Sequence, residues 1–305
     1  MSNEYKEKVA KFLQMLDDAD AVCIGIASGM SASCGYTFYY QPDRYFKREF
    51  GEFERKYGWS NAFDGLYYPY KTREERWAFL ATMVHLVLSL PVGQNYFDLK
   101  NLLAKKPFIA VTTNQDRQLY GVFDERDVVE LQGDWKLMQC DRQCCDEVWD
   151  GEEMYENMYA NINECKIPSE LVPKCPNCGG ELNHWVRSRT FLQGTRYANE
   201  YKKWRKFLDK HSGKKVLFLE LGVGRMTPMF IQEPFWQLVF STPKATYVTI
   251  NPKDAIVPRE IKSRSLAIGA DISKVFRDAL KLRENKNAKI VAEEFDGTFA
   301  PARIY

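Results

Sequence analysis

Four cysteines have the number and spacing of a zinc site. They form two pairs, Cys140 with Cys144 and Cys175 with Cys178, and a polar segment separates the pairs. Two such pairs supply the four thiolates of a tetrahedral zinc site, which leaves no open position for a reacting water. Proline and glycine in the second motif, Cys-Pro-Asn-Cys-Gly-Gly, let backbone N–H groups point at the sulfurs. We therefore expect one structural Zn²⁺ ion.

Other cysteines leave alternatives open. Cys145 directly follows Cys144 and competes with it as a ligand, and buried free thiols are the alternative without a metal. The sequence starts with no apolar signal segment, so we expect a cytoplasmic, reducing compartment, in which paired thiols hold metal rather than form disulfides. Cys23 lies in an apolar run and is expected in the core.

Apolar runs that alternate with helical patterns predict a parallel sheet. Runs typical of buried strands occupy residues 21–26, 108–112, 127–131, 215–221, 245–251 and 265–268. Helical patterns occupy residues 5–18, 73–91 and 272–283. This alternation predicts an α/β fold, a Rossmann-like parallel sheet with helices on both faces, together with a smaller inserted zinc-ribbon and helical module.

The cysteine motif interrupts the strand pattern, and this predicts the domain organisation. We expect residues 1–135 and 187–305 to form one Rossmann-like nucleotide-binding domain, and residues 136–186 to form the zinc-ribbon insert. The aromatic-rich stretch of residues 36–85 is too long for a simple connection, so we interpret it as a helical excursion from the sheet.

Composition excludes several functional classes. Hydrophobic residues make up 45% of the 305 residues, which excludes global disorder, and no apolar run approaches the length of a membrane span. The net charge of +2 gives no signature of a strongly basic surface, so we expect neither nucleic acid nor a membrane as a partner. There are only three histidines, His85, His184 and His211.

Small and polar residues follow the predicted strands, at the edge where parallel sheets bind ligands. After the first strand, small side chains let backbone N–H groups approach a pyrophosphate, although a generic tight turn explains the same residues: Ser28, Gly29, Met30 and Ser31. After the second strand, Asn114 and Asp116 place an amide and a carboxylate within reach of ribose hydroxyls, with an Asx turn as the alternative. Later strands are followed by Gln132, by Gly222-Val223-Gly224 and by Asn251.

Together these motifs resemble those of the sirtuin (Sir2) family over roughly residues 8–283. The resemblance implies that NAD is the co-substrate and that the first loop and the Asn114-x-Asp116 motif bind it. Gly222-Val223-Gly224 lies where the family has Gly-Thr-Ser, and Asn251 where it has a ribose-binding Asn. Asp271 and Ile272 fall where the adenine is covered.

The departures from the family pattern predict a change of reaction. Typical sirtuins have a His as general base where this chain has Gln132, and Gln has no proton equilibrium near neutral pH. Ala27 replaces a usual glycine, and the family's Pro-Asp-Phe-Arg motif is absent after the first loop.

The same departures make the chain closely similar to the class M sirtuins, the microbial branch linked to macrodomain proteins. The matching segments include Thr112-Thr113-Asn114, Gln132-Gly133-Asp134 and Phe218-Leu219-Glu220-Leu221-Gly222-Val223-Gly224. This resemblance implies protein ADP-ribosyltransferase activity, a lipoylated carrier like the glycine-cleavage H protein as acceptor, a macrodomain hydrolase as functional partner, and a role in oxidative stress.

The resemblance also implies roles for individual residues. Asn114 would fix the nicotinamide ribose, Gln132 would hold ribose hydroxyls, and Asp116 would shape the nicotinamide pocket. Arg187 would steer an anionic acceptor; a solvated charge is its alternative, and Arg189 replaces it if the register differs. The aromatic segment from Tyr67 to Tyr70 lines the nicotinamide or acceptor pocket or, alternatively, packs in the core, and Tyr68 is the member that we assign to the cofactor site.

Two other functions stay open at this point. One is a deacylase that uses an unusual base, against which Gln132 argues. The other is a non-catalytic sensor of NAD or ADP-ribose, which the altered first loop at Ala27 allows and the retention of Asn114 and Asp116 opposes.

Overall fold

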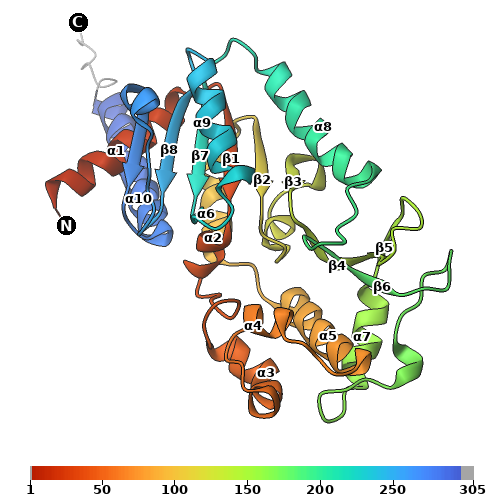
Figure 1. Cartoon of the computed structure of the whole chain (residues 1–305). Helices are drawn as coiled ribbons and strands as arrows, with labels where there is room; N and C mark the ends of the chain where they lie inside the picture. The colour runs from red at the N-terminus through yellow and green to blue at the C-terminus, as the bar shows by residue number, and fades with distance from the viewer. Residues whose placement is uncertain (1, 297–305) are drawn as a thin grey trace, which may run out of the picture.

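The computed structural model describes residues 2–296, and its centre is a six-stranded parallel sheet (Figure 1). The strand order is β3-β2-β1-β7-β8-β9, with every pairing parallel. The strands are β1 (Ala21–Ile26), β2 (Phe108–Thr112), β3 (Val128–Glu130), β7 (Val216–Leu221), β8 (Thr246–Ile250) and β9 (Ser265–Ile268). All six lie where apolar runs predict them, which confirms the expected fold class.

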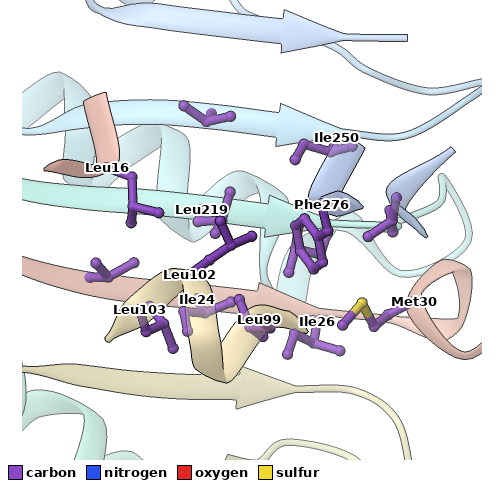
Figure 2. Close-up of a cluster of buried hydrophobic side chains, with 14 of the residues drawn as sticks. Leu16, Ile24, Ile26, Met30, Leu99, Leu102, Leu103, Leu219, Ile250 and Phe276 are labelled. Atoms are coloured by element: carbon purple, nitrogen blue, oxygen red, sulfur yellow. The ribbon is translucent and has the colours of Figure 1, made fainter. Parts of the chain in front are cut away.

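Helices cover both faces of this sheet. One face carries α1 (Asn3–Asp18), α6 (Gln94–Leu103) and α10 (Ile272–Asp296); the other carries α8 (Thr195–Lys210) and α9 (Gln232–Ser241). Side chains of β1 alternate between the two cores, as the period of a strand requires. Figure 2 shows the first core, where the helices meet the strands through Leu16, Leu102, Phe276, Ile24, Leu219 and Ile250.

Between β1 and β2 the chain leaves the sheet and builds a helical module. The short helix α2 (Ser28–Ala32) stays at the edge of the sheet, and the module consists of α3 (Arg44–Tyr57), α4 (Ala62–Tyr67) and α5 (Arg73–Ser89), which lie below the sheet in Figure 1. Its core is aromatic, with ring contacts among Phe46, Phe50, Phe53, Trp59 and Phe79. Helix α5 is buried on nearly all sides and begins with a capping box between Thr72 and Glu75.

A second, antiparallel sheet follows β3. Its order is β5-β4-β6, with β4 (Gly133–Cys140), β5 (Val148–Asp150) and β6 (Leu182–Val186), and α7 (Glu152–Ala160) packs against α5. Short 3₁₀ turns complete the fold: η1 (Gln118–Gly121), η2 (Glu125–Asp127), η3 (Ser169–Leu171), η4 (Pro228–Phe230) and η5 (Arg259–Arg264). The domain boundaries proposed from the sequence stay a prediction.

In the part of the chain that the structure describes, no single helix has the length and apolarity needed to cross a membrane. The bent pair of α5 and α6 meets that test only when the two helices are taken together.

Candidate active site

A cleft of about 470 Å³ opens at the carboxyl edge of the parallel sheet, between that edge and the helical module. Segments that follow β1, β2, β3 and β7 form one side of it. The structure brings eight of the predicted site residues into its lining: Ser28, Gly29, Ser31, Asn114, Asp116, Gln132, Arg187 and Gly224.

Asn114 is held firmly at the end of β2. Its backbone N–H donates to Thr112 Oγ1 at 2.9 Å, which is an ST-type turn. Its side-chain Nδ2 donates to the carbonyl of Ala27 at 3.2 Å and to Ser31 Oγ at 3.1 Å. Because these bonds occupy the amide nitrogen, the amide oxygen remains as an acceptor toward the cleft. The Asx turn that the sequence left open is therefore replaced by a bridge to the first loop.

Asp116 belongs to the same network. Ser31 Oγ donates to its carboxylate and also contacts the hydroxyl of Tyr96 at 2.8 Å. Burial raises the pKa of Asp116 above its ordinary value, and the hydrogen bond from Ser31 opposes that rise. The first loop, β2 and α6 are thus joined beneath the cleft by polar side chains.

The two glycine-containing loops touch each other. Gly29 N donates to the carbonyl of Gly222 at 3.1 Å, and a Cβ at Gly29 would lie 2.6 Å from Gly222 Cα. Gly222 has a φ of +64°, in the region that glycine adopts without strain. Asn251 fixes this contact from the side, because its Nδ2 donates to the carbonyl of Val223 at 2.8 Å.

Gln132 and Arg187 meet at the junction of the two sheets. Gln132 immediately precedes β4, Arg187 immediately follows β6, and Arg187 N donates to the carbonyl of Gln132 at 2.9 Å. Gln115 Nε2 donates to the same carbonyl at 3.2 Å. Arg189 is exposed and does not line the cleft, so the register favours Arg187 over its alternative.

Buried acidic side chains flank Gln132 two residues away on each side in the sequence. Asp134 is fully buried and forms an ion pair with Arg117, while the N–H of Glu130 donates to Glu200 of α8 at 2.9 Å. Burial, with the nearby charge of Asp134, raises the pKa of Glu130 well above its ordinary value. These contacts tie the segment on both sides of Gln132 to Arg117, which follows β2, and to Glu200 of α8.

Seven predicted cofactor residues do not line the cleft. Met30 and Ile272 are buried in the first core. Tyr68 packs against Tyr57 and Tyr70, which matches the core alternative for its role. The others support or flank the loops: Gly222, Val223, Asn251 and Asp271.

One wall of the cleft was not predicted except at Tyr67, which belongs to the segment considered for pocket lining. The helical module contributes the aromatic side chains Tyr36, Phe38, Tyr39, Tyr40, Phe63 and Tyr67, and the loop after β7 adds Met226 and Phe230. Tyr67 is 67% exposed and Met226 is 66% exposed, so apolar surface remains open at the cleft. The aromatic stretch after the first loop was the available signal, but it has the composition of a core.

No histidine lies among the described residues that line the cleft. His85 stacks on Tyr159, and His211 accompanies Phe207 at the end of α8. His184 is fully enclosed on β6, and burial lowers its pKa to about 3. None of the three is placed to exchange a proton with a ligand in the cleft.

The four predicted metal ligands come together at the far end of the small sheet. Their Sγ atoms lie within 4.8 Å of one another, with Cys140 and Cys178 3.7 Å apart and Cys144 and Cys175 3.5 Å apart. Burial opposes ionisation of Cys175, but backbone N–H groups of Cys178 and Asn177 outweigh it and lower its pKa to about 7. Four thiols in this arrangement can hold one structural zinc ion, and Cys145 lies outside the group.

The chain is similar to two curated proteins. A protein ADP-ribosyltransferase of Staphylococcus aureus (strain Mu50) is 33% identical over 281 residues, which are 90% of this chain and 88% of that protein. A probable bifunctional ADP-ribose hydrolase/ADP-ribosyltransferase of Fusarium oxysporum f. sp. cubense is 22% identical over 83% of this chain, which spans 44% of the length of that relative. No family model matches the chain.

Solved structures share the fold. Sir2Tm bound to a propionylated peptide has a TM-score of 0.56 and 18% identity, covering 92% of this chain and 99% of that one. A mutant Sir2 homologue in complex with ADP-ribose has a TM-score of 0.53 and 14% identity, covering 91% and 97%. Given this fold and the extent of the match to the S. aureus enzyme, the chain belongs to the sirtuin family.

Proposed function

We propose that this chain is an NAD⁺-dependent protein ADP-ribosyltransferase that releases nicotinamide and transfers ADP-ribose to a protein. One observation carries the proposal: the cleft joins Asn114, Gln132 and Arg187 and has no histidine among its described lining residues. The similarity to the S. aureus protein ADP-ribosyltransferase supports the same reaction class.

The first step is the departure of nicotinamide. The bond between ribose C1′ and the nicotinamide nitrogen breaks, the electron pair leaves with nicotinamide, and positive charge develops on the ribose. Asn114 holds its amide fixed through Ala27 and Ser31, so its free oxygen can orient the ribose hydroxyls without reorganising. Asp116 stands beside it to shape the space for the nicotinamide.

The second step is attack of the acceptor on C1′. In a deacylase the acyl oxygen attacks C1′, and a histidine base then drives the next bond formation. Gln132 can hold a ribose hydroxyl by hydrogen bonds but cannot remove its proton. The reaction therefore ends with glycosyl transfer to the acceptor nucleophile, and Arg187 is the cation available to receive an anionic group of the acceptor.

We further propose a lipoylated carrier like the glycine-cleavage H protein as the acceptor, with a role in redox defence. The resemblance to class M sirtuins supports this acceptor. The Fusarium relative, whose description combines a probable hydrolase with a transferase, supports a functional link to a macrodomain hydrolase. A cytoplasmic location is part of the same proposal.

The test is transfer of labelled ADP-ribose from NAD⁺ to that carrier, offered with and without lipoate. We expect label on the lipoylated carrier, and we expect Asn114→Ala to lower turnover about 100-fold or more, the scale of a lost preorganised polar group. Deacylation of an acetylated or propionylated peptide at a comparable rate would instead establish the deacylase. Bound NAD⁺ without nicotinamide release, with either carrier present, would establish the sensor.

A further inference from the structure

Arg187 is the only cation among the described residues that line the cleft. The direction of its guanidinium therefore determines where positive charge can meet an oxyanion, whether the diphosphate of NAD⁺ or a carboxylate of the acceptor. Arginine recognises such groups through a planar fork, so the plane of that fork matters as much as its position.

Three aromatic rings surround this guanidinium. Its central carbon lies 4.2 Å from the ring centroid of Phe191, 4.9 Å from that of Tyr197 and 5.3 Å from that of Phe230. Phe230 also lines the cleft, whereas Tyr197 does not. Ring faces attract a cation but leave it free to turn in its own plane, so the rings alone do not fix which nitrogen faces the substrate.

Two hydrogen bonds donated by one guanidinium nitrogen of Arg187 prevent the guanidinium from turning in its plane. Arg187 Nη2 donates to the hydroxyl of Tyr197 at 2.6 Å and to the carbonyl of Leu131 at 3.1 Å. The Arg187 Nε is buried and has no hydrogen-bond partner in the described structure. The orientation of the guanidinium therefore depends on the two bonds at Nη2, and only the one to Tyr197 comes from a side chain.

Tyr197 is itself well fixed. It lies in the first turn of α8, and its ring packs edge-on against Phe191 with 5.4 Å between the ring centroids. Helix α8 is tied to β3 through Glu200, which accepts from the N–H of Glu130 at 2.9 Å, and through Lys203, which donates to the carbonyl of Val128 at 2.6 Å. Strand β3 ends two residues before Gln132. Because α8 is bonded to β3, we infer that the distance between Tyr197 and Gln132 is fixed.

We propose that Tyr197 is a positioning residue for ADP-ribosyl transfer, which holds the Arg187 guanidinium in the plane that receives a substrate oxyanion. The inference rests on the proposed function. Tyr197 acts through Arg187 and does not line the cleft itself, so the loss of its hydroxyl should change the use of Arg187 rather than the cleft.

The first test compares Tyr197→Phe with Tyr201→Phe. Both remove one hydroxyl from α8 and keep the ring, but only the first removes a hydrogen-bond partner of Arg187. The second removes the 3.1 Å contact between the hydroxyls of Tyr201 and Tyr197 and leaves the bond from Arg187 to Tyr197 in place. Because a hydrogen bond to a charged group contributes about 1.5–3 kcal/mol, we expect Tyr197→Phe to lower transfer to the lipoylated carrier about tenfold or more. Tyr201→Phe should stay within about twofold of wild type, and equal losses in both variants would overturn the proposal.

The kinetic parameter that changes in Tyr197→Phe shows whether Arg187 receives the diphosphate of NAD⁺ or a carboxylate of the acceptor. A weaker affinity for NAD⁺ assigns the guanidinium to the diphosphate, whereas a raised KM for the carrier, or a lowered kcat at unchanged NAD⁺ affinity, assigns it to the acceptor. In an Arg187→Gln background, Tyr197→Phe should cause no further loss, because the group it positions is gone. Additive losses would show that Tyr197 acts independently of Arg187, and would overturn the proposal.

A measurement without any acceptor keeps this inference separate from the proposed function. The ¹⁵N–¹H resonance of the Arg187 Nε, identified by its loss in Arg187→Gln, should shift or broaden in Tyr197→Phe and stay in place in Tyr201→Phe. If wild type labels no carrier, the proposed function fails, and this resonance alone decides the inference. An Arg187 resonance unchanged by Tyr197→Phe would refute the positioning role.

Discussion

The two sheets of this protein are ordered by different means. The six-stranded sheet consists of nearly continuous apolar strands buried between helices on both faces, so burial alone can order it. In the three-stranded sheet β4 and β6 are also buried, but the edge strand β5 is partly exposed and thiols gather at the far end of the sheet. The large sheet contributes backbone loops to the cleft, while the small sheet delivers Gln132 and Arg187. The comparison indicates that the cofactor loops depend on apolar burial in the large sheet, whereas the positions of Gln132 and Arg187 also depend on the four thiols of the small sheet.

The junction between the sheets requires a glycine at position 133. Gly133 has a φ of +83°, and a Cβ there would collide with the carbonyl oxygen of Trp185 on β6. This glycine lets β4 pair closely with β6 immediately after Gln132. The position of the side chains at the junction therefore follows from the pairing of the small sheet.

Removal of a metal ligand should have the largest effect, and it should affect the small sheet far more than the large one. We expect Cys178→Ser to lose the zinc ion and to lower the free energy of unfolding by about 4 kcal/mol or more, because structural zinc supplies folding energy directly. Affinity for NAD⁺ should fall less than about threefold, since the loops of the large sheet remain. Metal analysis, thermal unfolding and NAD⁺ titration measure the three quantities.

Cys145→Ser is the matched control for this variant. Its Sγ lies 3.8 Å from that of Cys144 but outside the group of four. It should keep one zinc per chain and unfold like wild type. Zinc loss in this variant would assign Cys145 as a ligand, and loss of NAD⁺ binding in Cys178→Ser would show that the sheets are not independent.

The second variant addresses the large sheet. Gly29→Ala would bring a methyl group within 2.6 Å of the Gly222 backbone, which cannot give way as a flexible side chain can. Overpacking of this kind costs about 1–3 kcal/mol, so we expect NAD⁺ affinity to fall about 10- to 100-fold with zinc content unchanged. Gly51→Ala, on α3 with only an arginine side chain 3.7 Å away, is the control. Unchanged NAD⁺ affinity in Gly29→Ala would contradict the role of this contact.

The smallest expected effect is a change of stability with pH that arises from one buried carboxyl group in the large sheet. Glu220 on β7 is fully buried and accepts from Gln232, Tyr247 and Thr249, and burial raises its pKa to about 7 from an ordinary 4.5. Because the folded state holds the proton more tightly, its contribution to stability is full below the unfolded pKa and is lost as pH rises through about 7. We expect a loss of about 1 kcal/mol between pH 6 and 7.5.

Denaturant unfolding across this pH range, in wild type and Glu220→Gln, measures the contribution. The amide does not titrate, so the variant should show a flatter pH dependence. An identical slope in both proteins would mean that Glu220 is ionised in the folded state at these pH values, and that polar contacts as well as apolar burial order the large sheet.

The large sheet was predictable because each of its strands coincides with a short apolar run in the sequence. Residues 21–26 and 108–112 are uninterrupted apolar runs, and β1 and β2 occupy the same bounds. Strand β4 mixes glycine, charged, aromatic and apolar residues, and only its long-range partners on β6 define it as a strand. Helices α6, α8 and α9 were also missed. Helix α8 carries a local signal, because its buried residues Tyr197, Glu200 and Trp204 recur at helical spacing, but one of the three is charged and the pattern is hard to recognise.

The candidate site divides in the same way. Asn114, Asp116 and Gln132 follow strand ends, so their arrival at one edge could be predicted from topology. The aromatic wall could not, because Tyr67 lines the cleft while the adjacent Tyr68 packs against Tyr57. Tyrosines in a short helix and its cap differ only in direction, and the sequence does not encode direction without the surrounding packing.

The pairing of β4 with β6 has a consequence for how this protein can diverge. Gly133 pairs with Val186 at the cleft end, and Cys140 pairs with Leu182 at the metal end. The register shifts between Asp134 and Met138, and the pairing is regular from Met138 opposite His184 to Cys140 opposite Leu182. A residue inserted in that regular stretch would turn the side chains beyond it to the opposite face and so move the thiol of Cys140. Insertions and deletions among homologues should therefore be absent from this regular stretch and accumulate between the end of α7 and Cys175, a segment that holds none of the four zinc ligands.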